Sequence, residues 1–233
     1  MHFVISFAMA AGPALYLVAY FYAQDRRRPE PKGLVFLAFV WGFVAIIPAG
    51  LLEALFSSLL AERIAVPLMR RAVEAFVVVA LCEEGLKLLV VMVCCYRRRA
   101  FDEVMDGIVY TVVASLGFAC LENIIFVVDA GLKVAVARAF TAVPMHAIAS
   151  ALMGYYVGLS HFAATRRRRN LGLATGLAWA IGYHGTYDWL LLVQPQIGRF
   201  AFMGLVTVLA VGVLHVHYLL TQARELDAAA QRA

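Results

Sequence analysis

The chain contains few charged residues for its length. Asp, Glu, Lys and Arg make up 15% of its 233 residues, whereas a soluble domain carries about 25%. It also has no low-complexity stretch that would mark a linker between domains. Because 64% of the residues are hydrophobic, we expect a membrane protein in which one domain, residues 1–233, accounts for the whole length.

Cysteines with the spacing of a zinc finger are also absent. The four cysteines all fall inside apolar segments, which predicts buried free thiols rather than disulfides. The first apolar stretch has no basic residues before it and is long enough to span a bilayer, so it does not resemble a signal peptide. The net charge of +5 comes from short basic runs at segment ends. This pattern does not indicate a nucleic-acid partner.

Apolar segments of membrane-spanning length recur along the chain. A helix needs about 20 apolar residues to cross the hydrocarbon of a bilayer. The pattern predicts an all-α, polytopic membrane bundle of about seven helices, at roughly 3–23, 34–60, 72–96, 105–128, 138–162, 171–193 and 200–221. Between the second and third, residues 61–72 contain Pro67 and are compatible with a short interfacial helix.

The basic runs predict the orientation of this bundle. Runs of arginine at 26–28, 97–99 and 166–169 follow the first, third and fifth segments. Loops rich in Lys and Arg stay in the cytoplasm. We therefore expect the N-terminus outside, the C-terminus in the cytoplasm, and the lipid bilayer around the remainder.

Three charged residues interrupt the third segment. Glu83 and Glu84 are followed one helical turn later by Lys87, with apolar residues on both sides. A charge at the bilayer centre costs roughly 2.5–3.5 kcal/mol on insertion scales, and such residues usually mark a working site. Lys87 lies four residues after Glu83, so the two side chains share a helix face, and Lys87 is expected to be the charge partner.

Further polar residues occur in the next three segments: Glu122 and Asn123, then His146, then His184 and Asp188. At 1.5 Å per residue, the acids and histidines of all four segments lie within roughly 9–17 Å of the outer edge. A shared depth on four helices predicts a common site. Three other acids, Glu53, Asp106 and Asp129, lie near segment ends and are expected to be solvated without a role.

These residue types are suited to activating water. A carboxylate of the Glu83–Glu84 pair can act as general base, and Asp188, one turn after His184, can hold its ring in one tautomer. A catalytic metal such as Zn²⁺ needs three protein ligands and an open position, which Glu122, His146 and His184 can supply. The same histidines can instead stabilise an oxyanion without metal. The spacing is compatible with both schemes.

Taken together, four motifs resemble the PrsW family of bacterial intramembrane proteases. They are Glu83-Glu84-x-x-Lys87, Phe118-x-x-x-Glu122-Asn123, His146 in the following segment, and His184-x-x-x-Asp188. The family is distantly related to the CAAX prenyl endopeptidase and Abi group. In that wider group the second motif ends in histidine, so the role of Glu122 does not carry over directly and His146 can fill that place.

The resemblance implies a multi-pass endopeptidase of the bacterial inner membrane. It implies that Glu83, Glu84 and His184 are essential. On the chemistry of the residues themselves, His146 and Asp188 complete the expected catalytic set, and Zn²⁺ or another divalent metal is the candidate cofactor. The expected partner is a single-pass membrane protein, for which an anti-sigma factor cleaved near the extracytoplasmic face is the family's example.

A different class of function uses the same residues. In a proton-coupled transporter or channel, buried acids and histidines relay protons. Against this interpretation, the sequence shows no inverted repeat and no paired broken helices. A third interpretation is a sensor or assembly factor in which the buried charges are only structural.

Overall fold

A computed structural model describes residues 2–25 and 28–232, with side chains from residue 8 onward. All regular structure in these ranges is helical. The helices are α1 (His2–Tyr22), α2 (Lys32–Leu59), α3 (Pro67–Val73), α4 (Leu81–Cys94), α5 (Val104–Ala130), α6 (Leu132–Phe140), α7 (Ala142–His161), α8 (Arg166–Ile197) and α9 (Arg199–Ala230), with a 3₁₀ turn η1 (Ala61–Arg63) and a π-helical segment η2 (Glu74–Ala80).

Each of the seven predicted segments coincides with a helix or a run of helices. Within the described residues, four stretches are long and apolar enough to cross a membrane: Lys32–Arg63, Val104–Ala130, Leu132–His161 and Arg199–Ala230. A shorter apolar helix covers Ala8–Tyr22. The all-helical class and the presence of membrane-spanning helices are therefore confirmed, while the side on which each end lies stays a prediction.

Two segment boundaries differ from the prediction. Residues 61–72 do not form a separate helix, because Pro67 occupies the first turn of a helical run that continues through η2 into α4. Proline suits this position, where its missing N–H has no partner to lose. The predicted fifth segment is also longer and broken: Gly131, at φ 79°, ends α5, and the short α6 precedes α7.

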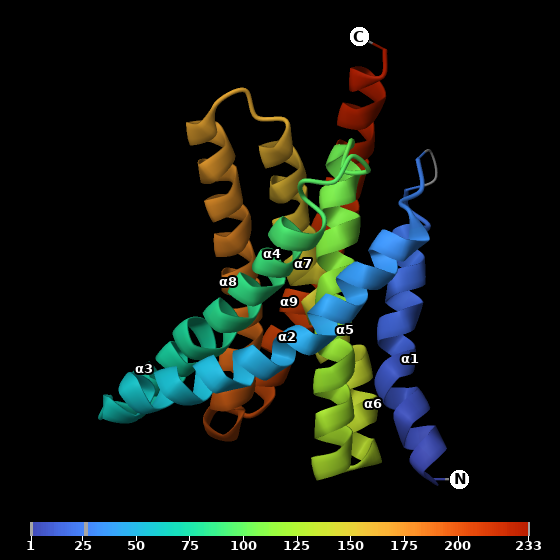
Figure 1. Ribbon diagram of the computed structural model, residues 1–233. Coiled ribbons are helices and arrows are strands. Elements are labelled where there is room, and N and C mark those ends of the chain that lie inside the picture. The colour runs from blue at the N-terminus through green and yellow to red at the C-terminus, as the bar shows by residue number, and fades with distance from the viewer. Residues whose placement is uncertain (1, 26–27, 233) are drawn as a thin grey trace.

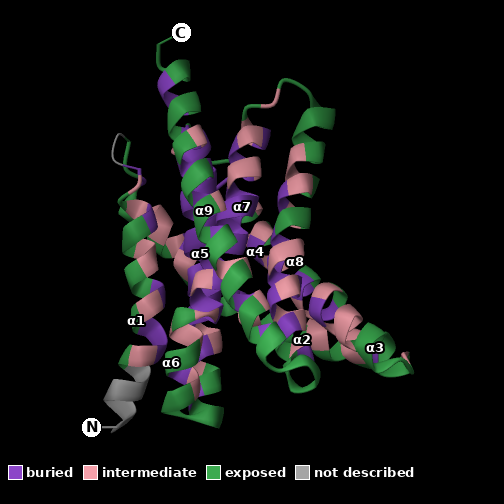
Figure 2. Cartoon of the chain, turned by 180° about the vertical axis from the view of Figure 1, so that it is seen from behind, coloured by how far each residue is buried: buried purple, intermediate pink, exposed green. Residues whose placement is uncertain are grey.

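Helix α5 forms the centre of the bundle. It packs against α7, α2 and α1, while α2 and the α3–α4 run lean away from it together (Figure 1). The buried positions concentrate where α5 and α7 meet (Figure 2). Gly154 and Gly158 of α7 allow this approach, because a Cβ at either position would overlap backbone atoms of α5. Small residues that let two backbones approach in this way are typical of helix pairs in membranes.

The three loops that follow α1, α4 and α7 lie at the same end of the bundle as the C-terminus, opposite the N-terminus (Figure 1). At this end, α5 begins with a capping box between Glu103 and Asp106. Asp227 of α9 adds to it by accepting hydrogen bonds from the backbone N–H groups of Val104 and Met105, at 2.7 and 3.0 Å. The end of α9 thereby fixes the start of the central helix.

Candidate active site

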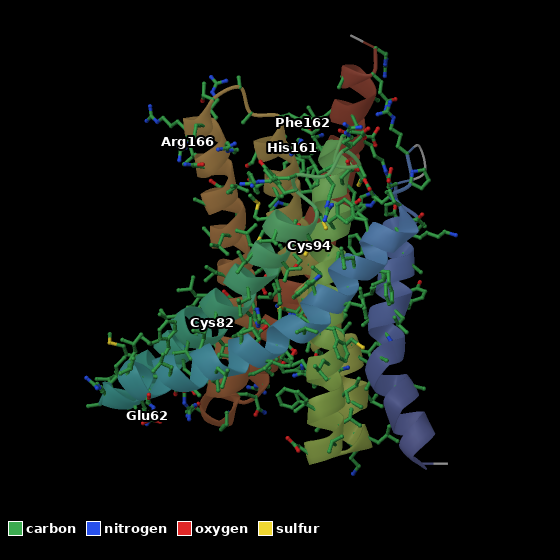
Figure 3. All side chains as sticks on the ribbon, in the orientation of Figure 1. Glu62, Cys82, Cys94, His161, Phe162 and Arg166 are labelled. Atoms are coloured by element: carbon green, nitrogen blue, oxygen red, sulfur yellow. The ribbon has the colours of Figure 1, made fainter. Side chains whose placement is uncertain are left out.

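The glutamate pair lies directly after the π-helical segment η2. Such segments are rare and are found frequently at functional sites. Cys82, the residue before the pair, lies between the Glu62 end of the bundle and the end that carries His161 and Arg166 (Figure 3). All four cysteines are buried free thiols, as the sequence predicts. The pair is therefore held inside the bundle and away from both ends.

Lys87 is the centre of a buried charge network. Its Nζ donates to Glu84 Oε1 at 2.7 Å, to Glu83 Oε2 at 3.0 Å and to His146 Nδ1 at 2.9 Å. An ammonium has three donors, and all three are used. Lys87 and Glu84 are fully buried, and Glu83 is 5% exposed. The predicted pairing of Lys87 with the glutamates is confirmed, and the contact with His146 joins α4 to α7.

His184 of α8 lies between two carboxylates. Its Nδ1 is 2.8 Å from Glu84 Oε1, and its Nε2 is 3.1 Å from Asp188 Oδ2. Because an ionised carboxylate only accepts hydrogen bonds, both ring nitrogens donate and the ring carries a positive charge when both carboxylates are ionised. Its centroid is 5.0 Å from that of His146. The predicted contact of His184 with Asp188 is confirmed.

His146 is held from its other side by Glu122. Lys87 can only donate to Nδ1, so the proton of the neutral ring is on Nε2, which lies 2.8 Å from Glu122 Oε2. Arg138 of α6 forms an ion pair with the same Glu122 oxygen, at 2.8 Å, and donates from Nε to Asn123 Oδ1 at 2.7 Å. This chain of contacts fixes the tautomer and the orientation of the imidazole.

Four residues offer ligand atoms that lie within 4.8 Å of one another: Glu83, Glu84, His146 and His184. Two imidazoles and two carboxylates form a donor set typical of zinc, and Glu84 Oε2 is buried without a hydrogen-bond partner among the described residues. The set therefore fits a divalent metal. Glu122 is not part of it, because it contacts the far ring nitrogen of His146. Protonated Lys87 and His184 neutralise the same carboxylates that a metal would need.

Sequence reasoning missed two residues near this site. Arg138 has no role in the sequence prediction, yet Gly131 turns the chain so that α6, which carries it, returns alongside α5. Glu53 of α2, which the sequence predicts to be solvated, is instead half-buried and interacts electrostatically with Glu122 and His184. Nothing in the spacing of either residue marks it. An arginine among the apolar residues that follow Lys133 is the one signal that the sequence offers for Arg138.

Comparison with known proteins also indicates a membrane protease. Residues 30–215 match the family described as PrsW family intramembrane metalloprotease. A protein named Protease PrsW from Geobacillus kaustophilus is 40% identical over 205 residues, which cover 88% of this chain and 86% of the relative. Protease PrsW of Bacillus subtilis is 35% identical over 191 residues, covering 82% and 84%. No solved structure shows significant similarity.

The buried site and these matches define an intramembrane peptidase. The chain belongs to the PrsW family of intramembrane metalloproteases. The resemblance noted from the four motifs is thus confirmed over most of the chain.

Proposed function

We propose that this protease cleaves a single-pass membrane protein, such as an anti-sigma factor, near the extracytoplasmic face of the bacterial inner membrane. The observation that carries the proposal is the meeting of Glu84, Lys87, His146 and His184 in one buried network that draws on three helices. Hydrolysis within a membrane needs polar groups arranged around a water molecule where few other partners exist. Of the two buried groups of acids and histidines that could hold a metal among the described residues, this is the larger.

Within this site, Glu83 has the role of general base. Glu84 is fully enclosed and hydrogen-bonded to both Lys87 and His184, whereas Glu83 retains some exposure and has one hydrogen bond, to Lys87. A base must reach the water that it deprotonates. Lys87 orients both carboxylates, and Glu84 and Asp188 together hold His184.

His146 and His184, with Glu84, are the residues that would hold a divalent metal, for which Zn²⁺ is the first candidate. Such an ion polarises a carbonyl and lowers the pKa of water. For both histidines to be ligands, His184 has to be neutral and Lys87 has to withdraw from His146 Nδ1. Glu122 and Arg138 would then orient His146 from its opposite nitrogen, a type of support that tunes metal affinity.

The basic loops support extracytoplasmic cleavage. They share one end of the bundle (Figure 1), and the positive-inside rule assigns that end to the cytoplasm. The sequence depth estimate puts the acids and histidines in the opposite half of the membrane. A substrate helix that enters this half of the membrane would meet Glu83 near the extracytoplasmic end of the substrate helix.

The direct test is cleavage of tagged single-pass proteins, with host anti-sigma factors as the first candidates, during co-expression. We expect a shortened fragment with the wild type and none with Glu83→Gln or His184→Ala. Asp129→Asn is the matched control, because this acid is exposed at the end of α5. Equal cleavage by wild type and both site variants would rule out the assigned residues. Intact substrates throughout, combined with proton flux in proteoliposomes, would favour the transporter interpretation.

Metal dependence is tested separately on the purified protein. We expect bound metal, measured by elemental analysis, to be lower in His184→Ala than in the wild type. Chelation is expected to abolish cleavage, and Zn²⁺ to restore it. Full activity in metal-free protein would instead support hydrolysis by the glutamates and histidines alone.

A further inference from the structure

A second group of carboxylates is buried at the end of the bundle that carries the basic loops. Asp25 and Glu30 belong to the loop between α1 and α2, and Asp106 lies in the first turn of α5. Each offers an oxygen within 4.8 Å of those of the other two. Asp25 is 4% exposed, Glu30 3% and Asp106 0%. The prediction that Asp106 is solvated is therefore wrong, because this loop covers it.

Two oxygens of this carboxylate group have no hydrogen-bond donor among the described residues. Asp106 directs Oδ2 at the backbone N–H groups of Asp102 and Glu103, both at 2.6 Å, and leaves Oδ1 buried without a donor. Asp25 Oδ2 is likewise buried and without a donor. Such oxygens are unfavourable unless a hydrogen-bond donor or a cation meets them. Burial also raises the pKa of Asp25 and of Glu30 above their usual values.

The described residues supply no cation to the group. Arg28 is close in sequence, but it pairs with Asp102 at 3.1 Å and Glu103 at 3.9 Å. Glu30 accepts from the hydroxyl of Tyr110, which is neutral. No lysine or arginine of the described ranges forms a salt bridge with any of the three carboxylates.

We propose that Asp25, Glu30 and Asp106 bind a hard divalent cation, with Ca²⁺ or Mg²⁺ as the class of ligand. An all-oxygen carboxylate site is typical of these ions. Ca²⁺–oxygen distances of about 2.3–2.6 Å place two ligands up to about 5 Å apart, which agrees with the observed separation. Mg²⁺ would require the oxygens to close further. The ion would fasten the α1–α2 loop to the start of α5, far from the glutamate pair.

Mn²⁺ binding to the full-length protein in detergent tests this proposal, with free Mn²⁺ followed by electron paramagnetic resonance. We expect Glu30→Gln and Asp25→Asn to weaken binding at least about tenfold, since affinity at such sites follows the number of ligand charges. Both residues lie in a loop, so these variants leave the capping box of α5 intact. Ca²⁺ is expected to displace Mn²⁺ and to raise the melting temperature of the wild type but not of Glu30→Gln.

Two controls separate this site from other acids. Glu225→Gln removes one exposed charge from the same end of the bundle without touching the start of α5, so Mn²⁺ affinity should stay within about twofold. His184→Ala disrupts the intramembrane site and should leave this Mn²⁺ binding unchanged.

The proposal is overturned by absence of Mn²⁺ and Ca²⁺ binding up to about 10 mM, above the range of weak protein calcium sites. It is equally overturned if Glu30→Gln and Asp25→Asn bind Mn²⁺ as the wild type does. A higher melting temperature of Glu30→Gln in chelator, without any cation response in the wild type, would show that a shared proton neutralises the group.

Discussion

At the scale of single residues, Lys87 is the side chain on which the site depends. It brings together two carboxylates of its own helix and an imidazole of α7. Two adjacent buried carboxylates repel one another, and a fully buried ammonium is costly unless it is paired. Each of these groups is tolerated in the bundle only because the others are present.

Removing the ammonium should therefore destabilise the fold. We expect Lys87→Met to lower the free energy of unfolding by about 3–5 kcal/mol, the usual effect of leaving one partner of a buried ion pair uncompensated. Thermal melting in detergent measures this change. Lys87→Met/Glu84→Gln, which also removes one of the carboxylates left without its ammonium, should recover part of the loss. Lys133→Met is the control, because Lys133 is exposed; an equal loss in this variant would contradict the explanation.

Asp188 is a second single residue whose replacement has a predictable effect, in this case on the cleavage rate. Its carboxylate holds His184 Nε2 at 3.1 Å, and asparagine keeps the size without the charge. We expect Asp188→Asn to reduce the cleavage rate by about 10–100-fold, as for other groups that orient a histidine ligand, with little change in melting temperature. The rate is measured on a purified substrate. Wild-type cleavage by Asp188→Asn would show that Glu84 alone orients the ring.

At the scale of elements, the site depends on how closely α7 approaches α5. His146 lies on α7 and Glu122 on α5, and their side chains meet at 2.8 Å between the two helices. Glycines provide this approach at Gly107 and Gly154, where each Cα faces the other helix. Close packing of this kind is a main source of association between helices in a membrane.

A methyl group at the crossing should push these helices apart. A Cβ at Gly154 would lie 2.7 Å from Ile108 Cα, so Gly154→Ala should cost about 1–3 kcal/mol, as overpacking usually does. Thermal melting and cleavage should both decline. Gly182→Ala on α8 is the matched control, because no atom lies within 4 Å of a Cβ there. If both variants melt alike, the glycine contact does not limit packing.

At the scale of the whole molecule, the basic loops gather at one end of the bundle. The basic loops and the C-terminus share one end, and the α2–α3 connection lies at the other (Figure 1). This arrangement agrees with an odd number of crossings. Together with the positive-inside rule, it predicts a cytoplasmic C-terminus.

Cysteine labelling checks this orientation. We expect Glu62→Cys to react with a membrane-impermeant maleimide in intact bacteria whose outer layers admit the reagent, and Ala229→Cys to react only after the membrane is opened. Both positions are exposed in the structure, and the four native cysteines are buried, so the wild type supplies a low background. The reverse pattern would place Glu83 and Glu84 in the cytoplasmic half of the membrane.

The sequence by itself determined the positions of the helices and the contacts between side chains of the same helix. The pairs Glu83–Lys87 and His184–Asp188 follow from the four-residue spacing, because side chains at that spacing share a face. Helix positions follow from the lengths of the apolar segments. The common depth of the four motifs also follows, since the rise per residue is constant.

Only the tertiary structure decided which residues meet across helices. Glu84 faces His184 and Glu122 faces His146 because of how α4, α5, α7 and α8 cross. Arg138 reaches Glu122 only because Gly131 turns the chain back. The burial of Asp106 depends on a loop from elsewhere in the chain. Residues near the ends of apolar segments read as solvated from sequence, because sequence position gives depth along a helix but not what covers it.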